Sequence, residues 1–264
     1  MGVFTQRDAH EDAAYLTATR DDLVMQMTVP FSGRFPAQIL SGLEVRRVLD
    51  VGCGVGQALL PLAVNQGALG VGLDLSAMAC RLGRESFKQY RPRAQTAFLR
   101  GQAEALPFAT GTFDVVNCTL ALPYTRNLPA LAEMSRVLRP GGMLILRIHH
   151  ALFYSSMLWR GVKSADIHPL IHGGRVLLGG AIYHLTGRQC RLKWLRETFQ
   201  TRWLLRRELK KTGLCLDSEL SVSHPLSPYF AIFKTGRREV TTSNQGIPCP
   251  REDSRRRVKP NQDP

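Results

Sequence analysis

A short β-branched run that stops at three closely spaced glycines constrains the fold of this chain most strongly. Residues 47–51 (RVLDV) have the composition of a buried strand, and residues 52–56 (GCGVG) interrupt them. An apolar stretch with helical character then covers 57–66. Glycines after a strand let the backbone approach a ligand closely, and a following helix presents free N–H groups. We therefore expect a ligand-binding turn at the end of this strand.

The alternation of strand and helix patterns continues after this turn. Strands are predicted at 69–74, 97–100, 113–118 and 143–148, and a helix at 128–138. Ser76 is placed to cap a further helix that begins directly after it. Strands that alternate with helices indicate an α/β fold, in which a mostly parallel sheet carries helices on both faces.

Two runs near the end of the chain predict a different strand pairing. They cover 214–222 and 229–234, and the loop between them contains two prolines. That loop is too short for a parallel crossover, so this pair should be antiparallel.

The segments around the alternating region have their own character. Helices are expected at 12–28 and 37–43, and a basic helix at 191–211 that ends at Gly213. Residues 151–190 are apolar and aromatic but interrupted by glycines, so they can form a cap, a substrate chamber or a subunit interface. The predicted division is an N-terminal helical cover (1–44), a cofactor-binding core (45–150), an inserted helical cap (151–203), a helix and strand pair that complete the core (204–236), and a disordered basic tail (237–264).

Composition excludes several classes of protein. The chain has 264 residues, of which 44% are hydrophobic and 21% charged, values typical of a globular domain and not of a disordered chain. No apolar run approaches the ~18 residues of a membrane span, and residues 1–10 lack a signal-peptide pattern, so a cytoplasmic location is expected. The six cysteines are widely spaced and form no CxxC pair, which indicates reduced thiols.

Positive charge is concentrated in one part of the chain. The formal net charge is +14, and residues 151–211 hold 12 Lys and Arg against three Asp and Glu, which gives +9. The electrostatic field of so much positive charge attracts anionic partners: acidic substrates, phospholipid headgroups or nucleic acid. Aromatic residues among the charges of 191–211 suggest either a helix docked on the sheet or peripheral contact with an anionic membrane.

Two acidic residues end the first two predicted strands. Asp50 lies beside the glycine turn, and Asp74 follows 24 positions later, where a carboxylate can accept both hydroxyls of a ribose. Gln57 occupies the position of the last glycine of the dinucleotide fingerprint GxGxxG, so that fingerprint is not met. Asp50 would also repel a pyrophosphate. A ligand that carries positive charge fits the turn better.

Four ordered motifs together resemble class I S-adenosylmethionine-dependent methyltransferases of the type 11 kind. They are residues 50–56 (DVGCGVG), 70–76 (GVGLDLS), 101–108 with 111–116 (GQAEALPF and GTFDVV), and 133–142 (EMSRVLRPGG). The resemblance covers about 45–150, and more loosely 204–235. It implies a Rossmann-like seven-stranded sheet whose last strand is antiparallel, and S-adenosylmethionine as the cofactor.

The resemblance also implies roles for individual residues. Asp50 would hold the cofactor's ammonium and Asp74 its ribose, with Leu75 against the adenine. The other implied cofactor-binding residues are Gly52, Cys53, Gly54, Gly56, Gln102, Ala103, Glu104, Cys118 and Thr119. Many relatives have Asp in place of Gln102, a change that keeps hydrogen bonding, and many have a His pair where residues 122–124 are Leu-Pro-Tyr.

Three residues near the expected acceptor position are candidates for catalysis. They are Tyr124, His149 and His150, although methyl transfer mainly needs in-line approach of the nucleophile, and a general base is not obligatory. His168 and His172 have the i, i+4 spacing of metal ligands, but no Glu or Cys accompanies them, so no metal site is predicted.

The sequence therefore predicts a methyltransferase that acts on an O, N or C nucleophile of a small, fairly apolar acceptor, such as a natural-product, quinone-like or lipid intermediate. One alternative is an RNA or protein methyltransferase that docks its acceptor on the basic segment 151–211. The other is a catalytically silent, methyltransferase-like binding subunit.

Overall fold

A seven-stranded sheet forms the centre of the computed structural model, which describes residues 6–28, 40, 43–190, 192–195, 197–219 and 227–234. The strand order is β3-β2-β1-β4-β5-β7-β6. Neighbouring strands from β3 to β5 are parallel, and β7 is antiparallel to both β5 and β6. The strands are β1 (Arg47–Val51), β2 (Leu69–Asp74), β3 (Thr96–Arg100), β4 (Phe113–Thr119), β5 (Leu138–Arg147), β6 (Leu214–Glu219) and β7 (Tyr229–Lys234). The predicted Rossmann-like sheet and its antiparallel strand pair are confirmed.

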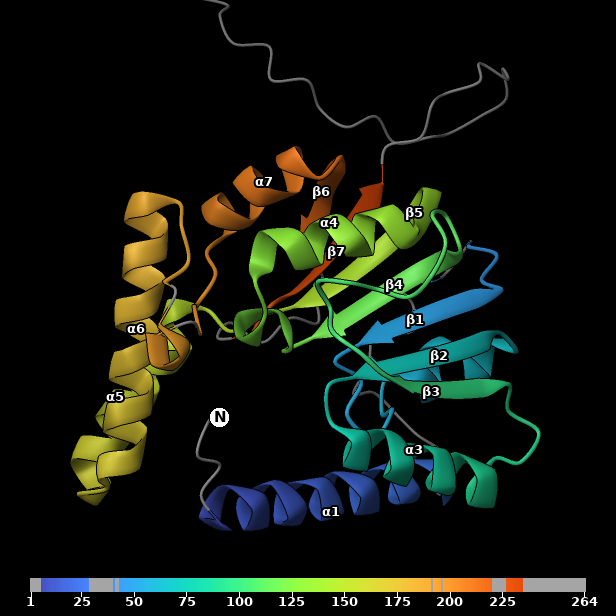
Figure 1. Cartoon of the computed structure of the whole chain (residues 1–264), viewed down its shortest axis with the longest axis horizontal. Helices are drawn as coiled ribbons and strands as arrows, with labels where there is room; N and C mark the ends of the chain where they lie inside the picture. Colours follow the sequence, from blue (N-terminus) through green and yellow to red (C-terminus); the bar gives the residue numbers. More distant parts are fainter. Residues whose placement is uncertain are drawn as a thin grey trace, which may run out of the picture.

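Helices cover both faces of this sheet (Figure 1). Helices α4 (Asn127–Val137) and α7 (Arg202–Lys211) lie over one face, and α3 (Ala77–Tyr90) and α1 (Gln6–Thr28) lie over the other. The short α2 (Leu59–Leu62) and the 3-10 turn η2 (Val64–Gln66) follow the glycine turn. Because β1 is covered on both sides, Val48, Leu49 and Val51 are all fully buried, as its unbroken apolar run predicts.

The C-terminal part of helix α1 is anchored to the rest of the protein. Leu23 and Met27 are buried in a cluster that includes residues of the glycine turn and of α3. The carboxylate of Asp22 accepts a hydrogen bond of 2.6 Å from the side chain of Gln57, and Arg91 donates to the carbonyl of Met27 at 2.6 Å. Helix α1 is therefore attached directly to the turn that follows β1.

Helices α5 (Ala151–Ser164) and α6 (Ile167–Thr186) pack against each other as a hairpin, which stands at the side of the sheet toward which β1 points (Figure 1). Of the glycines expected to interrupt this segment, Gly161 lies inside α5, Gly187 caps the end of α6, and the other four lie inside α6. A Cβ at Gly179 would come within 2.5 Å of the carbonyl oxygen of Leu195, and one at Gly180 would overlap the ring of Phe199. These glycines let the chain around 195–199 pack closely on the helix.

The predicted basic helix at 191–211 is wrong. A 3-10 turn η4 (Lys193–Leu195) comes first, the described residues 197–201 are non-helical, and only α7 is helical, with the Thr201 hydroxyl accepting from the N–H of Leu204. Glu197, Thr198 and Gln200 are buried, and their contacts with distant elements outweigh local helix propensity.

Other boundaries differ from the predictions by smaller amounts. The helix predicted at 57–66 starts only at Leu59, after Gly56 with its left-handed φ of 89°, and it is divided into α2 and η2. Strand β5 starts at Leu138, five residues earlier than expected. Most of the predicted helix at 37–43, residues 220–222 and the tail 237–264 lie outside the described residues.

Neither disulfides nor membrane-spanning helices occur in the part of the chain that the structure describes. Cys53, Cys80, Cys118, Cys190 and Cys215 are free thiols. No described helix combines the length and apolar character needed to cross a bilayer.

Candidate active site

The strand order reverses between β1 and β4, and parallel α/β sheets bind ligands at the carboxyl edge of such a switch point. Asp50 on β1 and Asn117 on β4 are register partners there, and the Asn117 amide donates a hydrogen bond of 2.7 Å to Asp50. Asp50 is only 2% exposed. Burial raises the pKa of Asp50 to about 7, the bond from Asn117 opposes this rise, and the charge of Asp74 adds to it.

The glycine turn is held against the end of β2 by backbone hydrogen bonds. The N–H groups of Gly52 and Cys53 donate to the carbonyl of Leu73 at 2.8 and 3.2 Å. Gly54 has a φ of 52° and donates its N–H to Asp74 at 2.8 Å. A Cβ built on Gly54 would meet no atom within 4 Å, so this part of the turn faces open space next to two acidic residues.

Asp74 is fixed by the backbone on both sides. One carboxylate oxygen accepts the N–H of Gly54, and the other accepts the N–H of Ser76, both at 2.8 Å. A carboxylate has about four acceptor positions, so each oxygen keeps one for a ligand hydroxyl. Leu75, the next residue, is 63% exposed although it is apolar, as expected for a side chain that covers a ligand.

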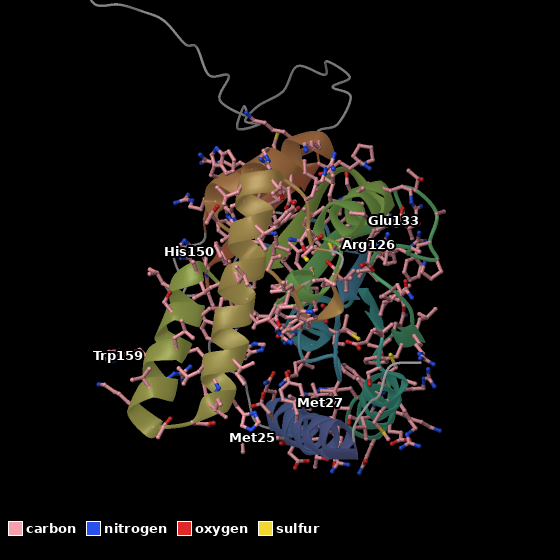
Figure 2. All side chains as sticks on the ribbon, turned by 60° about the vertical axis from the view of Figure 1, so that its left-hand side comes forward. Met25, Met27, Arg126, Glu133, His150 and Trp159 are labelled. Atoms are coloured by element: carbon pink, nitrogen blue, oxygen red, sulfur yellow. The ribbon has the colours of Figure 1, made fainter. Side chains whose placement is uncertain are left out.

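The loop after β3 is held in place by α4, through an ion pair between Glu133 and Arg136 at 2.7 Å. Glu133 accepts the N–H of Leu106 at 2.8 Å, and Arg136 donates to the carbonyls of Leu106 and Phe108 at 2.9 and 2.7 Å. Figure 2 shows Glu133 on α4, together with Arg126 at the start of that helix. The sequence motif at 133–142 therefore has a structural role that the sequence reasoning did not assign.

The predicted adenine-side residues lie in this same loop. Gln102 and Ala105 form an isolated bridge that closes a tight turn, and Ala103 between them is 8% exposed. The carboxylate of Glu104 accepts the N–H of Arg126 at 2.7 Å, so one of its oxygens is already used to fix α4.

The end of β4 packs closely against the glycine turn. A Cβ at Gly52 would overlap the side chain of Ala121, so only glycine fits there. Cys118 is fully buried, and burial raises the pKa of its thiol to about 12, which keeps it protonated. The hydroxyl of Thr119 donates to the Asn117 side-chain oxygen at 3.2 Å and so helps to fix the donor to Asp50.

His149 and His150 follow β5 and have different environments. His149 bonds to the Ser227 hydroxyl through Nδ1, and its ring stacks on Phe153 with 3.7 Å between centroids. Burial and the nearby charge of Arg147 lower the pKa of His149 to about 4, so the ring is neutral at pH 7. His150 is the N-cap of α5 and accepts the N–H of Leu152 at 3.4 Å (Figure 2 shows its position).

A polar cluster that the sequence did not indicate lies beside these residues. Glu197 is 6% exposed, and its carboxylate lies 3.2 Å from Arg175 and 3.5 Å from His172, both on α6. Partial desolvation of the hydroxyl, followed by the charge of Glu197, raises the pKa of Tyr124 to about 12, although the side chain as a whole is 61% exposed. The cluster joins the segment after β4, helix α6 and the chain before α7.

Two buried oxygens of this cluster lack hydrogen-bond partners among the described residues. They are Oη of Tyr154, whose ring is 1% exposed, and Oε1 of Glu197. Buried polar atoms are rarely left unpaired, because each costs about 1–3 kcal/mol. Trp159, an aromatic residue of the same segment, is 62% exposed on the outer side of α5 (Figure 2).

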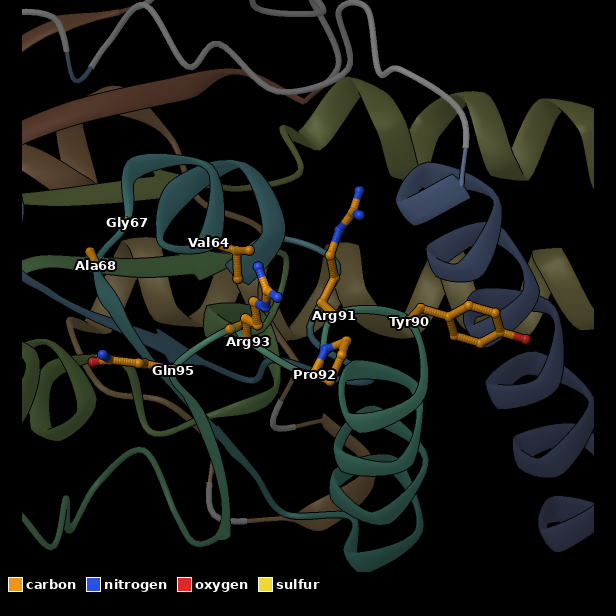
Figure 3. Close-up of a pocket in the computed structure, with 9 residues that line it drawn as sticks. Val64, Gly67, Ala68, Tyr90, Arg91, Pro92, Arg93 and Gln95 are labelled. Carbon is orange, nitrogen blue, oxygen red and sulfur yellow. The ribbon is translucent and has the colours of Figure 1, made fainter.

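A cavity of about 430 Å³ lies at the opposite edge of the sheet (Figure 3). It is lined by Ala68 and Gln95, which directly precede β2 and β3, and by the loop at 91–94. Because none of the predicted site residues reaches this amino edge, the cavity is separate from the switch point.

Comparisons with known proteins agree with this geometry. Residues 49–146 match the family described as "Methyltransferase domain". This part of the chain is a methyltransferase domain. The predicted relationship to class I S-adenosylmethionine-dependent methyltransferases is thereby confirmed.

Similar proteins share this methyltransferase domain. A demethylmenaquinone methyltransferase of Lactococcus lactis is 37% identical over 109 residues, which cover 40% of this chain and 42% of the relative. A sterol 4-C-methyltransferase of Caenorhabditis elegans is 32% identical over 99 residues, or 37% of this chain and 29% of the relative. The matched stretch thus spans less than half the length of these relatives.

A solved structure supports the fold of the methyltransferase domain and its surroundings. The S-adenosylmethionine-dependent methyltransferase of Methanosarcina mazei superposes with a TM-score of 0.54 at 21% identity, covering 76% of this chain and 98% of that one. At this identity the likeness concerns the fold alone.

The residues of the methyltransferase domain fit S-adenosylmethionine. The open space at Gly54 leaves room for a ligand next to the backbone, and Asp50 is the kind of group that attracts an ammonium. Asp74 keeps acceptor capacity for ribose hydroxyls. Sequence reasoning missed Asn117, the donor to Asp50, although its place near the end of the fourth strand was a usable signal.

Proposed function

We propose that this chain transfers a methyl group from S-adenosylmethionine to an O, N or C nucleophile of a small acceptor with an apolar body. The observation that carries the proposal is the buried Asp50–Asn117 pair beside the open glycine turn and Asp74. S-adenosylmethionine, when bound, supplies a methyl group on a positively charged sulfur. The chain's own part is to hold that molecule, to place the acceptor and to exclude water.

The acidic residues have complementary roles in this proposal. Asp50 in its ionised form attracts the ammonium of the cofactor, and Asp74 accepts the ribose hydroxyls. Leu75 and Ala103 provide apolar surface for the adenine, and the glycines admit the amino-acid portion close to the backbone. Gln102, Glu104, Cys118 and Thr119 complete the surroundings, with Glu104 acting mainly through α4 because Arg126 already occupies one of its oxygens.

The acceptor's place is beside the α5–α6 hairpin. Phe153, which is half-buried and stacks on His149, contributes aromatic surface, and the buried ring of Tyr154 packs behind Phe153 edge to face at 5.3 Å. Oη of Tyr154 and Oε1 of Glu197, which also interact with each other, can provide one donor and one acceptor. An acceptor with a ring or chain body and a hydroxyl or keto group satisfies both. The names of the two relatives, which refer to demethylmenaquinone and a sterol, support this class.

His149 and Tyr124 serve to orient the acceptor in this proposal. A histidine whose pKa is about 4 is a weak base, so a neutral His149 offers a hydrogen bond more readily than it removes a proton. Tyr124, whose pKa is about 12, keeps its proton and can donate it in a hydrogen bond. His150 contributes by capping α5 and so fixing the position of Phe153.

Calorimetric titration with S-adenosylmethionine tests the part of the proposal that concerns cofactor binding. We expect Asp74→Ala to weaken binding by about tenfold or more, since charge-assisted hydrogen bonds contribute about 1.5–3 kcal/mol each. Glu85→Ala is the matched control, because Glu85 is an exposed acid on α3 whose ion-pair partner Arg81 is also exposed. No binding by the wild type, or equal binding by Asp74→Ala, contradicts the proposal.

Mass spectrometry of a cell extract incubated with the enzyme and methyl-labelled cofactor tests the part of the proposal that concerns the methyl acceptor. We expect label in a small apolar product. Tyr154→Phe and Glu197→Gln should raise KM for that acceptor while the affinity for the cofactor stays unchanged. Label confined to RNA or protein supports the alternative acceptors, and cofactor binding without any labelled product supports a silent binding subunit.

A further inference from the structure

A second cavity lies outside both the cofactor site and the acceptor site. Its volume is about 400 Å³, and it is enclosed by the start of α4, the end of α6 with the chain that follows, and α7. Its lining contains four basic side chains and one acidic one: Arg126, Arg188, Arg207, Lys211 and Glu208. Apart from Arg126, which bonds to Glu104, none of these residues belongs to the proposed methyl-transfer machinery.

The basic side chains of this cavity are not neutralised by the described protein around them. Only Arg126 approaches a carboxylate, that of Glu104 at 3.8 Å, and no ion pair involves Arg188, Arg207 or Lys211 among the described residues. Arg207 stacks over Trp203 with 4.9 Å to the ring centroid, and its buried Nε has no hydrogen-bond partner. The stacking fixes the direction of this guanidinium. The Arg207 side chain therefore loses less conformational entropy when it binds an anion.

The acidic residue of the cavity is compatible with an anion. Glu208 is 2% exposed, and its Oε1 has no hydrogen-bond partner. Burial raises the pKa of Glu208 to about 8 against the opposing charge of the nearby Lys211, so at neutral pH its carboxyl group is mostly protonated. A protonated carboxyl group can donate an O–H to an oxyanion, so the cavity combines three unpaired cations with one neutral donor.

We propose that this cavity binds the phosphate of an anionic lipid headgroup. Guanidinium groups match phosphate oxygens in geometry, and the cavity is large enough to admit the group. The chain beside the lining residues carries exposed apolar side chains, which favour a lipid over a free phosphate: Leu185 is 87% exposed, Leu192 53% and Trp203 60%. Basic residues next to exposed apolar ones are typical of a surface that binds at a membrane interface.

Sedimentation of the full chain with phosphatidylcholine vesicles, with and without phosphatidylglycerol, tests the proposal. The variant is Arg188→Ala with Lys211→Ala, which removes two cations of the lining. The matched control is Arg206→Ala with Lys210→Ala, which removes two exposed cations of α7 that do not line the cavity. We expect the wild type to bind only the anionic vesicles, the cavity variant to lose about tenfold in affinity, and the control to lose less than about twofold.

Titration with inorganic phosphate and with glycerol phosphate, followed by tryptophan fluorescence, distinguishes the two sources of phosphate. Binding of these soluble ligands without vesicle binding overturns the lipid source. Equal losses in the two double variants overturn the cavity as the site, since they indicate a diffuse field of positive charge. Absence of binding to both vesicles and soluble phosphates overturns the proposal entirely.

Discussion

Asn117 on β4 donates a hydrogen bond of 2.7 Å to the buried carboxyl group of Asp50 on β1, across the point where the strand order reverses. Burial alone would strongly disfavour the ionised form of Asp50, and this bond partly offsets that cost. The resulting pKa of about 7 places the charge change of Asp50 in the physiological range. In the proposed function, the pair therefore couples cofactor binding to pH.

Binding of S-adenosylmethionine should weaken as the pH falls below 7. Protonation of Asp50, whose pKa is about 7, removes the negative charge that attracts the ammonium. We expect affinity to fall by about tenfold for each pH unit well below that pKa. Calorimetry between pH 5.5 and pH 7 measures this change. Asp50→Asn should bind weakly and show a flat profile, and a flat profile in the wild type would contradict the assignment.

Alanine at two glycines of the turn should separate folding from binding. Gly54→Ala places a methyl group in open space at a φ of 52°, so we expect a loss of only about 1–2 kcal/mol in the free energy of unfolding, but strongly reduced cofactor binding. Gly52→Ala also overlaps Ala121 and should cost about 1–3 kcal/mol more. Denaturant unfolding and calorimetry on both variants check this order. Unimpaired binding by a folded Gly54→Ala would place the cofactor elsewhere.

Removing Arg136 should weaken cofactor binding although its bonds go to the protein backbone. Arg136→Ala frees the carbonyls of Leu106 and Phe108 and leaves Glu133 unpaired, so we expect a loss of about 1–3 kcal/mol in stability and a severalfold weaker affinity. Arg81→Ala is the control, because its exposed pair with Glu85 should contribute less than about 1 kcal/mol. Unchanged cofactor affinity in a destabilised Arg136→Ala would show that the loop does not depend on this pair.

Glu208 should make the protein less stable as the pH rises from about 4.5 to about 8. The pKa of Glu208 is raised in the folded state to about 8 from 4.5, so over this range the folded state holds a proton that the unfolded state has released. The contribution of Glu208 to the free energy of unfolding is fully present below pH 4.5, and it is lost as the pH rises toward the pKa of the folded state. Denaturant unfolding at pH 5 and pH 8 measures the difference. Glu208→Gln should reduce it, and an unchanged difference would contradict the prediction.

Local patterns predicted the elements that carry the proposed cofactor site. Strands β2 and β7 have the predicted bounds, and Ser76 caps α3 by accepting the N–H of Ala79. Such features depend on residues within a few positions of one another, so a single stretch of sequence contains the relevant information. The motif that ends in Asp50 and the acid at Asp74 are of this kind.

The acceptor side was much less predictable. Arg175 lies in a segment predicted to be apolar and interrupted by glycines, and Glu197 lies in one predicted to be a basic helix. The structure pairs them at 3.2 Å and buries Glu197 near Tyr124. The glycines of α6 looked like interruptions because their use, close approach to the chain around 195–199, is visible only in the packed structure.

The sequence by itself determined the alternating strands and helices, the glycine turn and the two acids at the strand ends, because hydrophobic periodicity and backbone freedom are short-range properties. Only the tertiary structure decided which distant side chains meet: Asn117 with Asp50, Glu133 with the loop after β3, and Glu197 with the hairpin. Those contacts depend on packing and desolvation between segments far apart in the chain, for which no local pattern carries a signal.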